Sequence, residues 1–82
     1  MNVAQLRLFA SAREAAGRAH DNVPGTTVDE VLKTAVSRFG ADFETVLETC
    51  RVWVNGEQVV GSTPVTDSDE VAVLPPVSGG AT

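Results

Sequence analysis

Apolar residues recur between Val28 and Phe39 with the spacing of one helix face. Thr27 precedes this stretch and Glu30 follows three residues later, which is the spacing of a capping box. Gly40 stands where a helix commonly ends on a glycine. The apolar positions lie three or four residues apart, at Val28, Val31, Leu32, Ala35, Val36 and Phe39. The pattern predicts one amphipathic helix, whose apolar stripe has to be covered by a second layer of structure.

Segments with the alternation or composition of β-strands can supply that layer. They are Val3–Leu8, Ala19–Val23, Arg51–Val54, Glu57–Val60 and Glu70–Leu74. Asn55 and Gly56 tolerate the positive φ of a type I′ turn, so the third and fourth segments are expected to form a hairpin. Two short helical segments are also expected, one capped by Ser11 and ending at Ala16, the other over Asp42–Thr49.

A chain of 82 residues builds one hydrophobic core, so one folded domain is expected. The predicted order is strand, short helix, strand, long helix, hairpin and strand. One long helix lying across a mixed sheet is an α+β architecture, and we interpret it as a β-grasp. The predicted domain covers residues 1–74, and residues 75–82 form an extended C-terminal tail.

Charge and reactive side chains narrow the possible functions. The chain has 11 acidic and 6 basic residues, which argues against nucleic acid or anionic membrane as a partner and suits a basic protein. Residues 1–41 carry a net charge of +1 (5 bases, 4 acids) and residues 42–82 carry −6 (1 base, 7 acids). His20 and Cys50 are single residues of their types, so no multi-cysteine metal site, internal disulfide or catalytic cluster is expected. No signal peptide is visible, and we expect a cytoplasmic protein that binds no metal or cofactor and is not an enzyme on its own.

The last residues of the chain have an unusual composition. Pro75 and Pro76 fix φ and favour an extended exit from the final strand. Val77 and Ser78 follow, and then come Gly79 and Gly80. Such a tip is thin enough to enter a narrow channel on another protein, but its composition is also that of an ordinary frayed terminus.

Two segments resemble the MoaD family, the small subunit of molybdopterin synthase, within the MoaD/ThiS superfamily. Residues 6–17 read Leu-Arg-Leu-Phe-Ala-Ser-Ala-Arg-Glu-Ala-Ala-Gly, similar to the family's first strand and following helix. Residues 67–80 read Asp-Ser-Asp-Glu-Val-Ala-Val-Leu-Pro-Pro-Val-Ser-Gly-Gly, similar to its end, and the hairpin turn Val54-Asn55-Gly56 lies at the expected place. The resemblance extends from Val3 to Gly80.

This resemblance implies a ubiquitin-like sulfur carrier. A ubiquitin-activating-type enzyme would use ATP to adenylate the carboxylate of Gly80, which sulfur then converts to a thiocarboxylate. A MoaE-like large subunit would bind the tail, residues 75–79, and use the sulfur to build molybdopterin. Phe9 and Leu74 match positions that flank the tail and pack on the partner.

The residues after Gly80 depart from the family pattern. Ala81 places the Gly80 carbonyl in an amide, so the carrier role requires removal of Ala81-Thr82, for which a processing metalloprotease is the expected agent. Alternatives are a sulfur carrier for cysteine, thiamine or a secondary metabolite, a ubiquitin-like modifier, and a β-grasp binding module with an inert tail.

Overall fold

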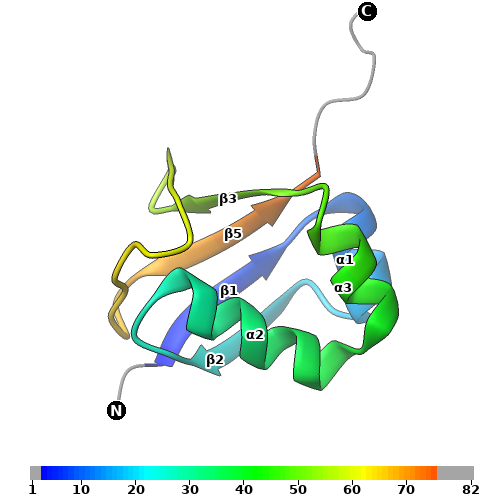
Figure 1. The fold of residues 1–82 in the computed structure, drawn as a ribbon, viewed down its shortest axis with the longest axis horizontal. Coiled ribbons are helices and arrows are strands. Elements are labelled where there is room, and N and C mark those ends of the chain that lie inside the picture. The colour runs from blue at the N-terminus through cyan, green and yellow to red at the C-terminus, as the bar shows by residue number, and fades with distance from the viewer. Residues whose placement is uncertain (1–2, 76–82) are drawn as a thin grey trace, which may run out of the picture.

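A computed structural model describes residues 3–75 of the chain (Figure 1). This range contains five strands and three helices. In chain order they are β1 (Val3–Leu8), α1 (Ala10–Ala16), β2 (His20–Pro24), α2 (Val28–Phe39), α3 (Ala41–Leu47), β3 (Arg51–Val54), β4 (Glu57–Gln58) and β5 (Glu70–Leu74). The elements appear in the predicted order. The predicted division into a domain over 1–74 and a tail over 75–82 stays a prediction, because most of that tail lies outside the described residues.

The five strands form one mixed sheet in the order β2-β1-β5-β3-β4. The first and last strands lie side by side and parallel at its centre, with Leu6 opposite Val71 and Leu8 opposite Val73. The other neighbouring pairs are antiparallel. Helix α2 crosses one face of this sheet, and α1 and α3 lie together at one end of it (Figure 1). This arrangement confirms the predicted β-grasp.

The core lies between the sheet and the helices. Its largest fully buried side chain is Phe43 of α3, and the other buried residues are apolar: Ala4, Leu6, Leu8, Ala12, Val23, Val28, Val31, Ala35, Val65, Val71 and Val73. Phe43 packs edge-on against Phe39, with ring centroids 5.2 Å apart. The apolar stripe of α2 is only partly in this core, because Leu32 and Val36 lie at its flank and are half-buried.

The ends of α2 follow the sequence prediction with one difference. The Thr27 hydroxyl accepts a hydrogen bond from the Glu30 backbone N–H at 3.2 Å, as a capping residue does. The Glu30 carboxylate, however, accepts from the N–H and hydroxyl of Thr26 rather than from Thr27. Both hydrogen bonds from Thr26 lower the pKa of Glu30, and the bond from the backbone N–H has the larger effect. At the other end Gly40 has a φ of 97° and its N–H donates to the Val36 carbonyl.

Two sequence expectations about element ends were wrong. Ser11 does not cap α1: Phe9 holds the N-cap position without a side-chain bond, and Ser11 lies inside the helix. The return strand of the hairpin ends at Gln58 rather than Val60. Beyond Gln58 the backbone turns to the start of α2, where the carbonyls of Gly61 and Thr63 accept from N–H groups of its first turn. The first N–H groups of a helix have no partner inside it. Bonding to them directs the backbone after Gln58 toward α2 instead of along β3.

Candidate partner-binding site

An apolar patch lies on the face of the sheet that the helices leave uncovered. It consists of Phe9, Trp53, Ala72 and Leu74, which we call the sheet-face patch. The strand register explains why they meet: Trp53 of β3 lies opposite Ala72 of β5. Phe9 follows β1, which runs parallel to β5, and this places it near Leu74. The patch is thus built by three segments that are distant in sequence.

Phe9 is the most exposed member of the patch. It follows Leu8, which is 2% exposed, yet Phe9 itself is 42% exposed. Its backbone N–H donates to the Val73 carbonyl at 3.3 Å, and its own carbonyl accepts from the N–H of Ala12. The backbone of Phe9 is therefore fixed between β5 and α1 while its ring faces outward. Phe9 therefore continues the outward face of Gln5 and Arg7 but is aromatic rather than polar. Its role in binding a partner stays a prediction.

Leu74 ends β5 and is half-buried, as is Pro75 after it. The remaining predicted tail residues, namely Pro76, Val77, Ser78, Gly79 and Gly80, lie outside the described residues, as do Ala81 and Thr82. The structure therefore gives the point from which the tail leaves the sheet. That point adjoins Phe9 and the rest of the sheet-face patch.

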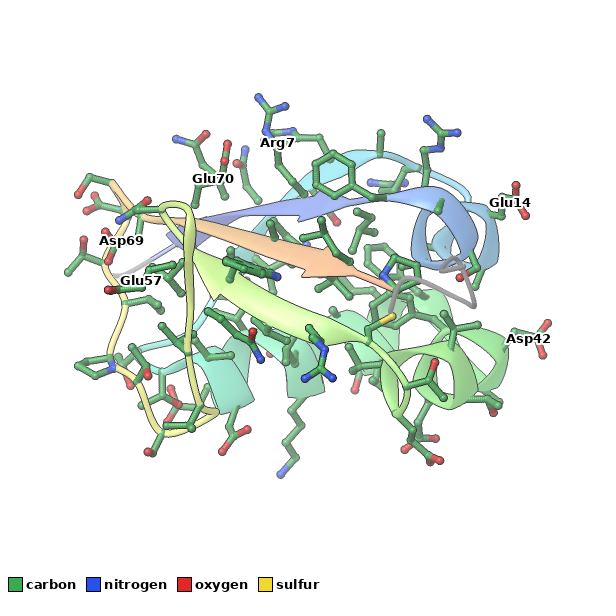
Figure 2. All side chains as sticks on the ribbon, turned by 90° about the horizontal axis from the view of Figure 1, so that it is seen from above. Arg7, Glu14, Asp42, Glu57, Asp69 and Glu70 are labelled. Atoms are coloured by element: carbon green, nitrogen blue, oxygen red, sulfur yellow. The ribbon has the colours of Figure 1, made fainter. Side chains whose placement is uncertain are left out.

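An ion pair and a polar network border the patch on the same face. The Arg7 Nε and a carboxylate oxygen of Glu70 are 2.7 Å apart, and both side chains are about half exposed. Figure 2 shows the two reaching toward each other above the sheet, on the side away from α2 and α3. An exposed pair of this kind adds little stability, so its main effect here is to give the patch a polar edge.

Asp69 ties the hairpin turn to the start of β5. Its carboxylate accepts from the Asn55 side-chain amide at 2.9 Å and from the Thr66 N–H at 2.8 Å. Both hydrogen bonds lower the pKa of Asp69, and the bond from Asn55 has the larger effect. The Asn55 side-chain oxygen in turn accepts from the N–H of Glu70. Asn55 and Gly56 have φ of 52° and 85°, the positive values that the predicted type I′ turn requires, and Gly56 lies at the edge of the patch.

The two reactive side chains considered from sequence lie away from the patch. His20 is exposed on β2. Cys50 is half-buried, its thiol contacts the Val46 carbonyl at 3.2 Å, and burial raises its pKa. Within residues 3–75 no three histidine, cysteine or acidic side chains gather where they could hold a metal ion. None of the helices in this range is long and apolar enough to cross a membrane.

Trp53 and Ala72 are the members of the patch that the sequence prediction missed, and Trp53 is the larger of the two. Its strand was predicted, but the face of the tryptophan was not assigned. The signal was present in the alternation of the strand, because Val52 and Val54 pack on the core and Trp53 must then point the other way.

Comparison with known proteins identifies the class to which this fold and patch belong. The sequence model of the ThiS family matches residues 6–80. The chain therefore belongs to the ThiS family, within the MoaD/ThiS superfamily of ubiquitin-like sulfur carriers. This confirms the resemblance drawn from sequence. The match includes Gly80 and stops before Ala81. None of the curated proteins compared with the chain matches it.

Solved structures agree with this fold over nearly the whole chain. SAMP1 from Haloferax volcanii, a small archaeal modifier protein, is 30% identical with a TM-score of 0.83, covering 95% of this chain and 99% of that one. A chain of the BexX/CysO complex from Amycolatopsis orientalis is 25% identical with a TM-score of 0.75, covering 94% and 99%. A chain in the complex of molybdopterin-converting factor subunits 1 and 2 from Helicobacter pylori is 22% identical with a TM-score of 0.70, covering 95% and 99%, and shows the fold alone.

Proposed function

We propose that this protein carries sulfur as a thiocarboxylate on Gly80 and donates it for molybdopterin synthesis, after removal of Ala81 and Thr82. The main support is that the family match ends on Gly80, six residues beyond the strand that ends at Leu74. The sheet-face patch supports the same proposal, because it offers an apolar docking surface where the tail begins.

The chemistry requires a free carboxylate at Gly80. A carboxylate is a poor electrophile, so an oxygen of Gly80 attacks the α-phosphorus of ATP and pyrophosphate leaves. Sulfide released by a sulfur donor then attacks the acyl carbon and AMP leaves, so that sulfur replaces one carboxylate oxygen. The resulting thiocarboxylate is ionised at neutral pH and is a soft nucleophile. ATP and the catalytic groups belong to the ubiquitin-activating-type partner, so the carrier acts as a cosubstrate and binds no cofactor of its own.

The residues before Gly80 would guide the tail into the partner. In this proposal Pro75 and Pro76 stiffen its start, Val77 and Ser78 follow, and Gly79 enters the channel because it has no side chain. Phe9 and Leu74, with Trp53 and Ala72, would bind the surface around the channel mouth. The MoaE-like large subunit and the activating enzyme would use this patch in turn.

Acidic side chains near the patch would favour basic partners. Glu57, Asp69 and Glu70 gather at the hairpin end of the sheet (Figure 2). Charges attract a partner over roughly 8–10 Å at physiological salt, so this end can steer the carrier toward a basic channel mouth. Arg7 neutralises part of this charge through its pair with Glu70.

A second candidate is attachment to other proteins through Gly80. It is favoured by SAMP1, which is named as a modifier and is 30% identical to this chain, whereas the molybdopterin-converting subunit is 22% identical. The similarity to a chain of the BexX/CysO complex, at 25% identity, supports a role in another sulfur pathway in the same way. All three roles need the same activated Gly80, so they differ in the acceptor and not in the first chemical step.

Pyrophosphate exchange with the co-encoded activating enzyme tests that first step. Three proteins are compared: the 82-residue chain, a chain ending at Gly80, and that trimmed chain with Gly80→Val. We expect exchange only with the trimmed chain, because Ala81 removes the reacting oxygen and a side chain at position 80 would meet a channel fitted to glycine. Equal exchange from the 82-residue chain, with no cleavage seen by mass spectrometry, contradicts the requirement for trimming. No exchange from the trimmed chain contradicts the carrier role.

Mass spectrometry of the protein from its native cell separates the candidate roles. A chain ending at Gly80 whose mass is raised by the difference between sulfur and oxygen supports sulfur transfer. Isopeptide-linked conjugates through Gly80 support the modifier role instead. Incubation of the thiocarboxylate form with a MoaE-like subunit and cyclic pyranopterin monophosphate then tests molybdopterin as the product.

A further inference from the structure

A second apolar groove lies between α2 and α3, apart from the sheet-face patch. Its floor consists of Leu32 and Val36 of α2 and Leu47 of α3. These side chains are half-buried and pack against the core from outside it. Four charged side chains lie at its edges: Asp29, Lys33, Glu44 and Glu48. We call this site the helix groove.

Helical spacing explains how the groove is built. Asp29, Leu32, Lys33 and Val36 follow one another at intervals of three, one and three residues, which places them along one flank of α2. Glu44, Leu47 and Glu48 form the matching flank of α3. The residues of α2 that point at the sheet belong to a different stripe and are fully buried. The groove is therefore a feature additional to the core.

The groove and the sheet-face patch lie on opposite sides of the sheet. The helices α2 and α3 lie below the sheet in Figure 2, whereas Arg7 and Glu70 stand above it. One partner on the patch would therefore leave the helix groove open to a second.

The rim of the groove carries more negative than positive charge. Asp29, Glu44 and Glu48 are exposed carboxylates, and Lys33 is the exposed cation among them. None of these four side chains forms an ion pair with another residue in the 3–75 range. The three carboxylates are therefore available to positive groups of a partner.

We propose that the helix groove binds a basic amphipathic helix of a partner protein. Apolar side chains one helical turn apart would fill the floor formed by Leu32, Val36 and Leu47, and flanking Lys or Arg residues would meet the acidic rim. A second copy of this chain is disfavoured, because its net charge of −5 and its own acidic rim would repel the first. This inference does not rest on sulfur transfer or on Gly80.

Nuclear magnetic resonance of the ¹⁵N-labelled 82-residue protein tests the proposal. The probe is a synthetic peptide with leucines at helical spacing and lysines on the rest of its surface. Its control has glutamate in place of each lysine. We expect saturable shifts in the amide signals of Leu32, Val36 and Leu47 with the lysine peptide and none with the glutamate peptide, while Phe9 and Trp53 stay unchanged.

Exposed rim residues provide variants that should not disturb folding. Glu44→Gln with Glu48→Gln is expected to weaken peptide binding about three- to tenfold, as the loss of two exposed ion pairs does. Lys33→Gln is expected to strengthen it about two- to threefold, because a repelling charge is lost. The matched control is Glu14→Gln with Asp67→Asn, which makes the same change in net charge at exposed positions outside the groove.

Each contrary outcome overturns the proposal. Equal weakening by the control pair would mean that the peptide responds to net charge only. Shifts confined to Phe9, Trp53 and their neighbours would mean that it binds the sheet-face patch. Groove signals that change with protein concentration before any peptide is added would assign the groove to contact between copies. No saturable binding at about 1 mM peptide would leave the groove without the proposed function.

Discussion

The two faces of the sheet present side chains from the same strands to different surroundings. On the inner face Leu6, Leu8 and Val73 are buried beneath the helices. On the outer face Phe9 and Leu74 remain partly exposed, although each directly follows one of those buried residues. The chain thus changes from core to surface within a single peptide step, at the end of β1 and again at the end of β5.

This difference separates what the fold needs from what a partner would use. A small domain reaches a stable core by covering one sheet face with helices, and the other face is then free to be polar. The outer face is polar at Arg7 and Glu70, but it is apolar where Phe9, Trp53 and Leu74 meet. Apolar side chains gathered at the start of the tail are not needed for the core, so they point to an interaction.

The largest expected effect is on the inner face. Leu8→Ala removes a side chain that is 2% exposed and leaves a cavity beside Val73, so it should lower the free energy of unfolding by about 2–5 kcal/mol. Urea denaturation followed by circular dichroism measures this change. An unfolding free energy within 0.5 kcal/mol of the original, roughly that of a neutral surface change, would remove the distinction between the two faces.

The adjacent residue should behave in the opposite way. Phe9→Ala is expected to weaken binding of the trimmed chain to its activating enzyme by ~1–2 kcal/mol, as the loss of an apolar anchor does. Its effect on unfolding should stay below about 2 kcal/mol, because 42% of the residue is already exposed. Isothermal titration calorimetry gives the first value and urea denaturation the second. A loss of stability matching that of Leu8→Ala would place Phe9 in the core.

A smaller effect is expected where α2 begins. Thr27→Ala removes the hydroxyl that accepts from the Glu30 N–H and should cost about 0.5–2 kcal/mol of stability. Binding through the sheet-face patch should not change, since Thr27 lies outside it. Thr27→Ser keeps the hydroxyl and serves as the control. Equal losses from both variants would show that the methyl group, and not the cap, stabilises the helix.

The smallest effect concerns acid. The pKa of Asp69 is lowered in the folded protein, so the unfolded chain binds a proton more readily. The stabilisation is complete above the ordinary pKa of 3.8 and is lost as pH falls through the lower folded value. Asp69→Asn should therefore reduce the fall in melting temperature below about pH 4. An unchanged pH profile would mean that the network with Asn55 and Thr66 does not stabilise the fold.

Much of the fold could be predicted from sequence, because apolar spacing, helix caps and strand alternation all indicate the same elements. The stripe from Val28 to Phe39 and the caps around it predict α2 with its observed ends. The alternation of β1 and β5 predicts which of their side chains are buried. The errors occurred where tertiary contacts outweighed local preference. The hairpin strand stopped at Gln58 because the following carbonyls bond to α2, and Phe9 rather than Ser11 precedes α1.

The residues of the candidate site also differ in whether the sequence alone could show them. Phe9, Leu74 and Gly80 could be named from sequence, because each matches a position of the family that the chain resembles. Trp53 was missed because its neighbours in the patch come from β1 and β5, and no local pattern shows which strands pair. The helix groove was likewise invisible, because Leu32 and Leu47 look like core positions until the angle between α2 and α3 is known.

By itself, the sequence determined the type and order of the elements, the apolar side of α2 and the family of the protein. These depend on periodicity and on motifs, which are properties of neighbouring residues. Only the tertiary structure decided that Trp53 joins Phe9 and Leu74, and that Leu32 and Leu47 line a groove. Both arrangements depend on strand register and helix packing, which are set by the whole core and by no single segment.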